Sequence, residues 1–168
     1  MVYAKVFIMV YANRDYPKNL TICKRLKNKL GKLLAQFFPL NKVRVLGLKL
    51  CGFDIGEQVY IGQELIVASV LSDKSCHLII GDRVAVGPRV TILLSSDANW
   101  SKLMEKIKPI RSTVVLEDDC WIGAGAIIMP NISVGQSAII GSGAVVVKNV
   151  EPLTVVAGNP AKVIRRMQ

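Results

Sequence analysis

A six-residue spacing of aliphatic residues constrains this chain more than any other feature of its sequence. The aliphatic positions fall into three runs: 55, 61 and 67; 80, 86 and 92; and 116, 122, 128, 134, 140 and 146. A glycine directly follows most of them, for example at Gly56, Gly123 and Gly141. An amphipathic helix needs apolar residues about every 3.6 positions, and a half-buried strand needs them at every second position. A period of six fits neither element and is typical of a parallel β-helix.

The same repeat indicates how such a coil closes. A second small or apolar residue precedes each aliphatic residue by two positions, and alternate residues of a strand point to the same side. Both side chains therefore point inward, and the glycine occupies the corner, where a positive φ or a close approach of two backbones is needed. Three strands and three corners make a triangular coil of about 18 residues, with coils stacked roughly 4.8 Å apart. The sequence thus predicts an all-β fold.

The six-residue phase breaks twice. Thirteen residues separate Val67 from Ile80, which predicts one extra residue near 71–76. Across 95–112 the spacing is kept, but its chemistry is lost, because polar side chains would point into a dry core, at a high cost in free energy. These inward positions hold Ser96, Lys102 and Lys108. We therefore expect residues 95–112 to leave the coil as a loop, and long loops in compact domains are often functional.

Charge and length divide the chain further. At 168 residues it is one domain with an appendage. The net charge is +10, yet residues 16–53 alone contain nine Lys or Arg and no Asp or Glu. Leucine and phenylalanine recur at helical spacing in this stretch. We expect residues 1–50 to form a basic amphipathic helical segment and residues 51–168 to form the β-helix.

Two roles for the basic segment remain open. A basic amphipathic helix is typical of contact with an anionic membrane surface. Alternatively, it caps the open end of the β-helix, since repeat stacks need capping. Nucleic acid is not an expected partner, because no stacking aromatic residues accompany the bases.

The remaining features point to a cytoplasmic chain, peripheral at the inner membrane face if the basic segment binds lipid. Residues 2–12 are apolar apart from Lys5, but they are too few to span a bilayer and lack a cleavage site, so we expect a first strand or an interfacial segment. The four cysteines show no metal-ligand spacing and are expected to be reduced. Cys120 falls at an inward position and is expected in the core.

Three segments of the chain resemble a known family. Residues 117–126, EDDCWIGAGA, resemble the D-x-x-W-I-G-x-G segment of the hexapeptide-repeat acyltransferases. Residues 140–148, IGSGAVVVK, resemble their IGAGSVVTK segment, and residues 157–165, AGNPAKVIR, resemble their AGNPAKVIR terminus. The chain is most similar to the maltose, galactoside and xenobiotic acetyltransferases and to their relatives from surface-polysaccharide synthesis.

This resemblance implies a left-handed parallel β-helix with a short C-terminal helix, assembled as a homotrimer with its sites between neighbouring subunits. It implies acetyl-CoA as the acyl donor, with no metal. It also implies that a histidine at the start of the protruding loop takes the proton of the acceptor hydroxyl, without a covalent acyl-enzyme.

The catalytic base is the point at which this chain departs from the family. The position of the family histidine holds Asp97, and the only histidine is His77. Three hypotheses stay open. Asp97 is the base, with its pKa raised by burial beside a tryptophan; or His77 is the base, stacked one coil below Ser95; or the chain binds ligands without catalysis.

The resemblance also assigns binding roles to individual residues. Acceptor contacts are expected from the loop residues Ser95, Asn99 and Trp100. Contacts with acetyl-CoA are expected from two small residues that let the pantetheine approach the backbone, from a tryptophan that walls it, and from bases near the phosphates. These residues are Ala124, Ser142, Trp121, Lys148, Lys162 and Arg165.

The function expected from the sequence is transfer of acetyl from acetyl-CoA to a hydroxyl of a sugar or glycan intermediate, in surface-polysaccharide biosynthesis. N-acetylation of an amino sugar and a trimeric scaffold without activity are the alternatives. A γ-class carbonic anhydrase is excluded, because its metal needs three histidines and the chain has one. Nucleotidyltransferases of this fold carry a further nucleotide-binding domain, for which the chain has no room.

Overall fold

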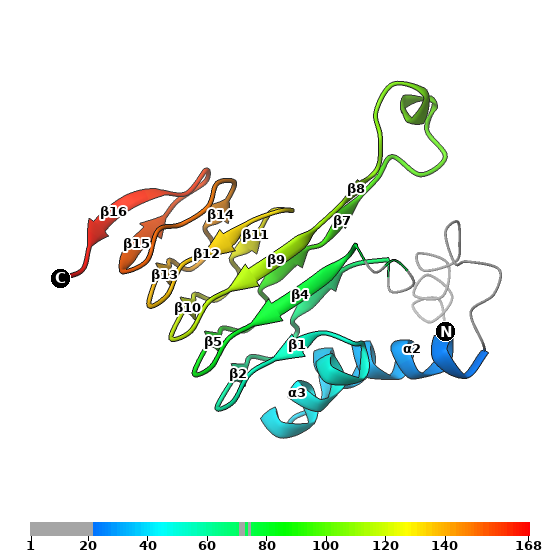
Figure 1. The fold of residues 1–168 in the computed structure, drawn as a ribbon, viewed down its shortest axis with the longest axis horizontal. Helices are drawn as coiled ribbons and strands as arrows, with labels where there is room; N and C mark the ends of the chain where they lie inside the picture. Colours follow the sequence, from blue (N-terminus) through cyan, green and yellow to red (C-terminus); the bar gives the residue numbers. More distant parts are fainter. Residues whose placement is uncertain (1–21, 71–72, 74) are drawn as a thin grey trace.

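The described residues form a parallel β-helix with two α-helices at one end and an antiparallel strand at the other (Figure 1). The computed structural model describes residues 22–70, 73 and 75–168. The first strand or interfacial segment expected at residues 2–12 lies outside the described residues. The helical elements are α2 (Ile22–Phe37), α3 (Asn41–Leu50) and a short 3-10 helix, η1 (Lys102–Glu105).

Three parallel sheets make the three faces of the coil. The first face holds β1 (Asp54–Ile55), β4 (His77–Ile80), β9 (Thr113–Leu116) and β12 (Ser133–Val134). The second face holds β2 (Tyr60–Ile61), β5 (Ala85–Val86), β10 (Trp121–Ile122), β13 (Ile139–Ile140) and β15 (Thr154–Ala157). The third face holds β3 (Ile66–Ala68), β6 (Thr91–Leu93), β11 (Ile127–Ile128) and β14 (Val145–Val146).

The repeat positions pair in register and form the core. Ile122 pairs with Val86 below and with Ile140 above, and all three side chains are fully buried. The residues two positions earlier are buried as well, including Cys120, which confirms its expected place in the core. Each coil therefore adds a layer of aliphatic side chains, and the burial of this apolar surface holds the stack together.

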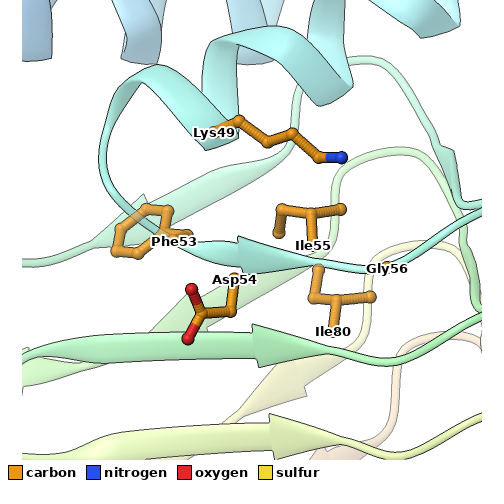
Figure 2. A pocket seen from close by; sticks show the side chains of 6 residues that line it. All are labelled: Lys49, Phe53, Asp54, Ile55, Gly56 and Ile80. Atoms are coloured by element: carbon orange, nitrogen blue, oxygen red, sulfur yellow. The ribbon is translucent and has the colours of Figure 1, made fainter.

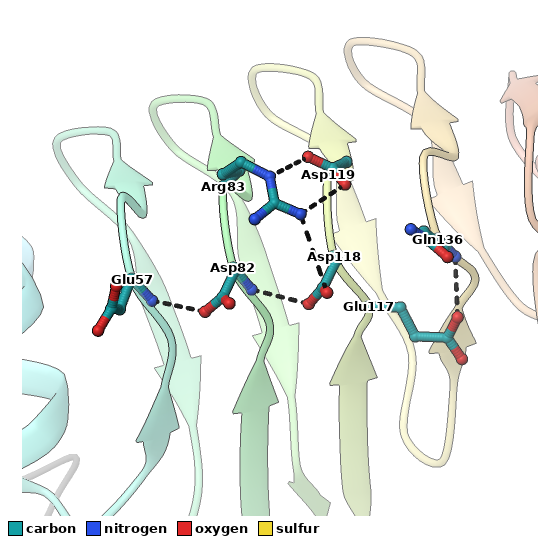
Figure 3. Close-up of polar contacts among 7 residues, drawn as sticks. All are labelled: Glu57, Asp82, Arg83, Glu117, Asp118, Asp119 and Gln136. Atoms are coloured by element: carbon teal, nitrogen blue, oxygen red, sulfur yellow. Dashed lines mark hydrogen bonds and ion pairs between the residues drawn. The ribbon is translucent and has the colours of Figure 1, made fainter.

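Carboxylates fasten the corners between the first and second faces (Figure 3). Asp82 accepts the backbone N–H of Glu57 at 2.7 Å, and Asp118, one coil further, accepts the N–H of Asp82 at 2.8 Å. Arg83 donates to Asp119 at 2.6 Å, and this guanidinium lowers the pKa of that carboxyl. The acidic run before Trp121 thus satisfies corner N–H groups that would otherwise lack partners.

Both breaks in phase lie at the corner between the third and first faces. Ile80 pairs with Ile55, which stands 25 positions earlier, whereas Val134 and Leu116 are paired 18 positions apart. The segment between β3 and β4 therefore adds seven residues, and the prediction of one extra residue was wrong. A period of six cannot distinguish one added residue from seven, because seven is one repeat plus one.

The second break is the excursion loop. Residues 95–112 leave the coil as an antiparallel ribbon of β7 (Ser95–Ser96) and β8 (Ile110–Arg111), which protrudes from the body of the molecule (Figure 1). Ser112 re-enters the stack by donating its N–H to the carbonyl of Leu94 at 2.9 Å.

The expected C-terminal helix was wrong. Residues 162–166 form the strand β16 (Lys162–Arg166), which pairs antiparallel with β15. The last coil of a β-helix leaves the backbone groups of its final strand without partners. A returning strand satisfies them, and a helix would not.

The two α-helices cover the other end of the stack. Arg44 is buried and donates to the carbonyls of Ile61, at 2.6 Å, and Phe38, at 2.7 Å. Glu64 donates its backbone N–H to the carbonyl of Gln36 at 2.9 Å. The basic segment therefore caps the first coil, which is one of the two roles considered for it.

Candidate active site

The foot of the excursion loop gathers the charged residues of the candidate site. Arg111 Nη2 lies 3.1 Å from Asp97 Oδ2, and Arg111 Nε lies 3.7 Å from Asp73 Oδ2. Asp97 Oδ1 also accepts the backbone N–H of Asn99 at 3.0 Å. The side chains of Arg111 and Asp97 are only 14% and 17% exposed. Asp97 thus holds the two stems of the loop together.

The surroundings of Asp97 differ from those expected of a base enclosed by tryptophan. Trp100 is 72% exposed, and Trp121 stands on the second face, away from the loop foot. Both carboxylate oxygens of Asp97 already accept hydrogen bonds. The carboxylate of Asp97 is therefore engaged in holding the loop rather than directed at an acceptor.

His77 is part of a carboxylate–histidine pair. Its Nε2 lies 2.8 Å from Asp54 Oδ2 on the neighbouring strand β1, and its ring packs edge-on against Phe53. In a neutral imidazole, a carboxylate partner at Nε2 favours the tautomer with the proton on Nε2 and the lone pair on Nδ1. A carboxylate that fixes the tautomer and orientation of a histidine in this way is a recurring feature of general bases.

The neighbour of His77 is not the one expected from the sequence. It pairs with Thr113, and Ser95 pairs instead with Arg111 in the loop ribbon. The loop removes 18 residues from the stack, so the next coil on the first face begins at Thr113. His77 nevertheless stands at the loop foot, since its N–H donates to the carbonyl of Ser112 at 3.2 Å.

An open hollow adjoins Asp54 (Figure 2). Its volume is about 450 Å³, and it lies between α3 and the first two strands of the first face. In Figure 2, Lys49 extends over β1 from α3, while the carboxylate of Asp54 points toward the neighbouring strand. The hollow therefore has a cation and an anion at its rim. Its lining residues are Lys49, Phe53, Asp54, Ile55, Gly56 and Ile80.

Three of the six residues expected to bind acetyl-CoA lie on a different edge of the molecule. Ala124 and Ser142 occupy successive corners between the second and third faces, and both are exposed. The N–H of Gly143 donates to the carbonyl of Ala124 at 2.9 Å, which stacks these corners. Lys162 pairs with Ala157 at the end of the same edge.

The other three residues expected to bind acetyl-CoA do not lie on this edge. Trp121 is 58% exposed on the second face, between Ala85 and Ile139. Arg165 pairs with Val155, on the second face as well. Lys148 lies between the third and first faces, on the edge from which the excursion loop leaves.

Sequence reasoning missed three residues of the candidate site: Asp54, Asp73 and Arg111. Asp54 is an outward residue of β1, and its proximity to His77 depends on the seven-residue insertion that the period left undetermined. Arg111 closes the loop and could have been suspected, because it is the last base before the point where the apolar pattern resumes.

Comparison with known proteins settles the family. The model of the bacterial transferase hexapeptide family (six repeats) matches residues 113–148, which include β9 to β14. The chain belongs to the hexapeptide-repeat transferase family. The fold of this family is the left-handed β-helix.

Several solved and curated relatives of this hexapeptide-repeat transferase are named as acetyltransferases. A maltose O-acetyltransferase from Clostridium difficile 630 is 25% identical, with a TM-score of 0.60, and the match covers 88% of this chain and 90% of that one. A hexapeptide-repeat acetyltransferase from Vibrio cholerae, complexed with acetyl-CoA, has a TM-score of 0.65 at 20% identity, with 93% of each chain covered.

The galactoside O-acetyltransferase of Escherichia coli K12 is 28% identical over 116 residues, which are 68% of this chain and 57% of the relative. The chain spans little more than half the length of the curated relatives that it matches over the longest segments.

Proposed function

We propose that this hexapeptide-repeat transferase is an acetyl-CoA-dependent O-acetyltransferase, that its acceptor is a hydroxyl of a sugar or glycan, and that it acts as a homotrimer. The observation that carries the proposal is the separation of the candidate residues onto two edges of one β-helix. His77, Asp97 and the excursion loop lie on the edge between the third and first faces. Ala124 and Ser142 lie on the edge between the second and third faces.

The two edges cannot meet within one chain, because a whole face of the coil lies between them. A cyclic trimer solves this problem, since each copy can present one edge to the copy on its left and the other to the copy on its right. Three equivalent sites result, each with a loop foot from one copy and a row of small corner residues from the next. The relatives named for maltose and galactoside support the choice of a sugar acceptor.

At the loop foot, we assign the base to His77. Asp54 orients the imidazole and holds the proton on Nε2, so that Nδ1 accepts the proton of the acceptor hydroxyl. The hydroxyl oxygen bonds to the thioester carbonyl carbon, the carbon–sulfur bond breaks, and the proton passes to the departing thiolate. Ser95, Asn99 and Trp100 contact the acceptor from the loop.

Along the other edge, the chain binds the donor. The small side chains of Ala124 and Ser142 let the pantetheine approach the backbone closely. Trp121 offers an exposed apolar wall, 58% accessible in a single chain. Basic groups bind the nucleotide phosphates, because guanidinium and ammonium groups form strong charge-assisted hydrogen bonds with phosphate. Lys162 supplies one from the end of this edge and Arg165 another from the adjoining second face, while Lys148 comes from the loop edge of the neighbouring copy.

A screen for thiol release tests the function. The protein is first titrated with acetyl-CoA by calorimetry and then incubated with acetyl-CoA and a panel of sugars, with free thiol as the readout. We expect binding and thiol release with a hydroxyl acceptor, and a loss of about 10²–10⁴-fold in turnover for His77→Ala. Amino sugars with the amine blocked distinguish O- from N-acetylation. Absence of acetyl-CoA binding would instead support a scaffold.

The origin of the acceptor and the place of the reaction in the cell belong to the same proposal. An acceptor that is an intermediate of surface-polysaccharide synthesis would be met in the cytoplasm, at the inner face of the membrane. Acetylation of polymer fragments in preference to free mono- and disaccharides would support it, and the reverse preference would contradict it.

A further inference from the structure

The helix α2 rests on the β-helix with its small residues and turns its large apolar residues outward. Asn28, Gly31 and Ala35 are buried. A Cβ on Gly31 would lie 2.7 Å from the carbonyl oxygen of Gly47 in α3, so the two helices cross at very close range. The side of α2 that packs on the protein therefore carries almost no large apolar side chain.

The opposite side of α2 carries a continuous apolar stripe. Its large residues are 49–66% exposed. Since an α-helix has 3.6 residues per turn, their spacing places them on one face, roughly opposite the buried side. We call this face the α2 stripe; it consists of Cys23, Leu26, Leu30 and Leu33. A surface helix normally turns such a face toward the core. A large exposed apolar patch rimmed by polar residues marks an interaction site.

The charges around the α2 stripe indicate what kind of surface binds it. By helical spacing, Lys27 and Lys29 border it on its two sides, and both are exposed. Lys42 and Lys49 of α3 are exposed as well, and no acidic residue occurs anywhere from 16 to 53. A second copy of the chain on this face would bring like charges together. An anionic lipid surface accepts the apolar stripe among its acyl chains and the lysines among its headgroups.

We propose that the α2 stripe and its flanking lysines dock this protein on an anionic lipid bilayer, with α2 parallel to the membrane plane. In the part of the chain that the structure describes, no helix is both long and apolar enough to cross a bilayer. The contact is therefore interfacial. The proposal is independent of acyl transfer, and it agrees with the capping role of the same segment, because capping uses the other side of the helix.

Vesicle sedimentation tests the proposal. Wild-type protein is mixed with vesicles of phosphatidylcholine alone or of phosphatidylcholine with phosphatidylglycerol. We expect binding only to the anionic vesicles, and weaker binding as salt rises through about 0.1 M, where the Debye length is about 10 Å. Each lysine near an anionic surface contributes about fivefold to the partition constant. The double variant Lys27→Glu with Lys29→Glu should thus lower binding by at least about tenfold.

Matched variants separate the stripe from its charges. Leu30→Ser with Leu33→Ser should abolish vesicle binding and leave thermal stability unchanged. The control Leu153→Ser removes an equally exposed leucine, 45% accessible, from the opposite end of the stack and should bind as wild type does. An environment-sensitive fluorophore on Cys23 should shift to the blue on anionic vesicles only.

Four outcomes would overturn the proposal. If wild-type protein does not bind anionic vesicles, the proposal is wrong. Loss of binding in the charge variant but not in the stripe variant indicates a soluble polyanion as the partner. Lower thermal stability of the stripe variant, but not of Leu153→Ser, shows that the chain itself covers the stripe. A change of oligomeric state in the stripe variant shows that another copy covers it.

Discussion

Substitution of Gly123 by alanine tests the close stacking of the corners along which we place the donor. Gly123 has no positive φ, so alanine meets no conformational penalty there. A Cβ at this position would lie 2.5 Å from the backbone nitrogen of Ser142 and 2.7 Å from the carbonyl oxygen of Ile140. Both atoms belong to the backbone of the next coil and cannot rotate away.

The cost follows from how far the coils must separate. Ordinary contact for a Cβ begins near 3.4 Å, so this corner must open by about 0.9 Å. The bond from the N–H of Gly123 to Ile140, at 2.7 Å, and that from Gly143 to Ala124, at 2.9 Å, would then exceed hydrogen-bonding range. Two lost backbone bonds at about 1 kcal/mol each, plus strain in the packed core, give a loss of about 2–4 kcal/mol.

Gly125→Ala is the matched control. Gly125 has a φ of +68° and nothing within 4 Å of its Cβ position, so only the left-handed conformation is penalised. The left-handed conformation costs alanine about 1–2 kcal/mol. Part of this cost is offset, because alanine also lowers the conformational entropy of the unfolded chain. We expect urea unfolding at one fixed protein concentration to rank wild type, Gly125→Ala and Gly123→Ala in decreasing stability. Equal losses for the two variants, or a larger loss for Gly125→Ala, would refute the argument from coil spacing.

Three further predictions concern the site and the core. Asp97→Asn should lower turnover by less than about tenfold, whereas a loss of 10² or more would make Asp97 the base instead of the histidine. Arg165→Ala should weaken acetyl-CoA binding in calorimetry by about tenfold, and Lys29→Ala, which removes an exposed base from α2 at the other end of the stack, should not. Burial raises the pKa of the Cys51 and Cys120 thiols to about 11. Because the folded state holds the thiol protons more tightly than the unfolded state does, these thiols stabilise the fold fully below their ordinary pKa of 9.0. The free energy of unfolding should therefore fall as the pH rises from about 9 to 11. Replacement of both thiols by alanine should remove that part of the pH dependence.

The sequence was sufficient to predict the coil, because each repeat fixes its own inward residues. Burial of Ile122 and Ile140 follows from a local pattern of strand and corner. The excursion loop was also predictable, since three polar residues at inward positions cannot stay in a dry core. These features depend on interactions within one or two repeats.

Other features depend on register over longer distances, and there the sequence was not sufficient. The contact of His77 with Asp54 requires the true length of the insertion between β3 and β4, which the period leaves ambiguous. The strand β16 forms because β15 has an open edge, and the sequence of residues 162–166 alone does not predict a strand. The outward direction of the α2 stripe depends on the close crossing at Gly31, which a helical pattern cannot reveal.

Mixed trimers test most directly whether each site is built from two copies. His77→Ala disables the loop foot, and Ala124→Trp blocks the row of corner residues on the other edge. Each variant alone should form stable trimers with negligible thiol release. When equal amounts are unfolded together and refolded, every mixed trimer contains one site with two intact edges, so activity should recover to about one quarter of that of wild type treated identically. Mixtures that stay inactive, while each variant still assembles as a trimer, would contradict a site shared between copies.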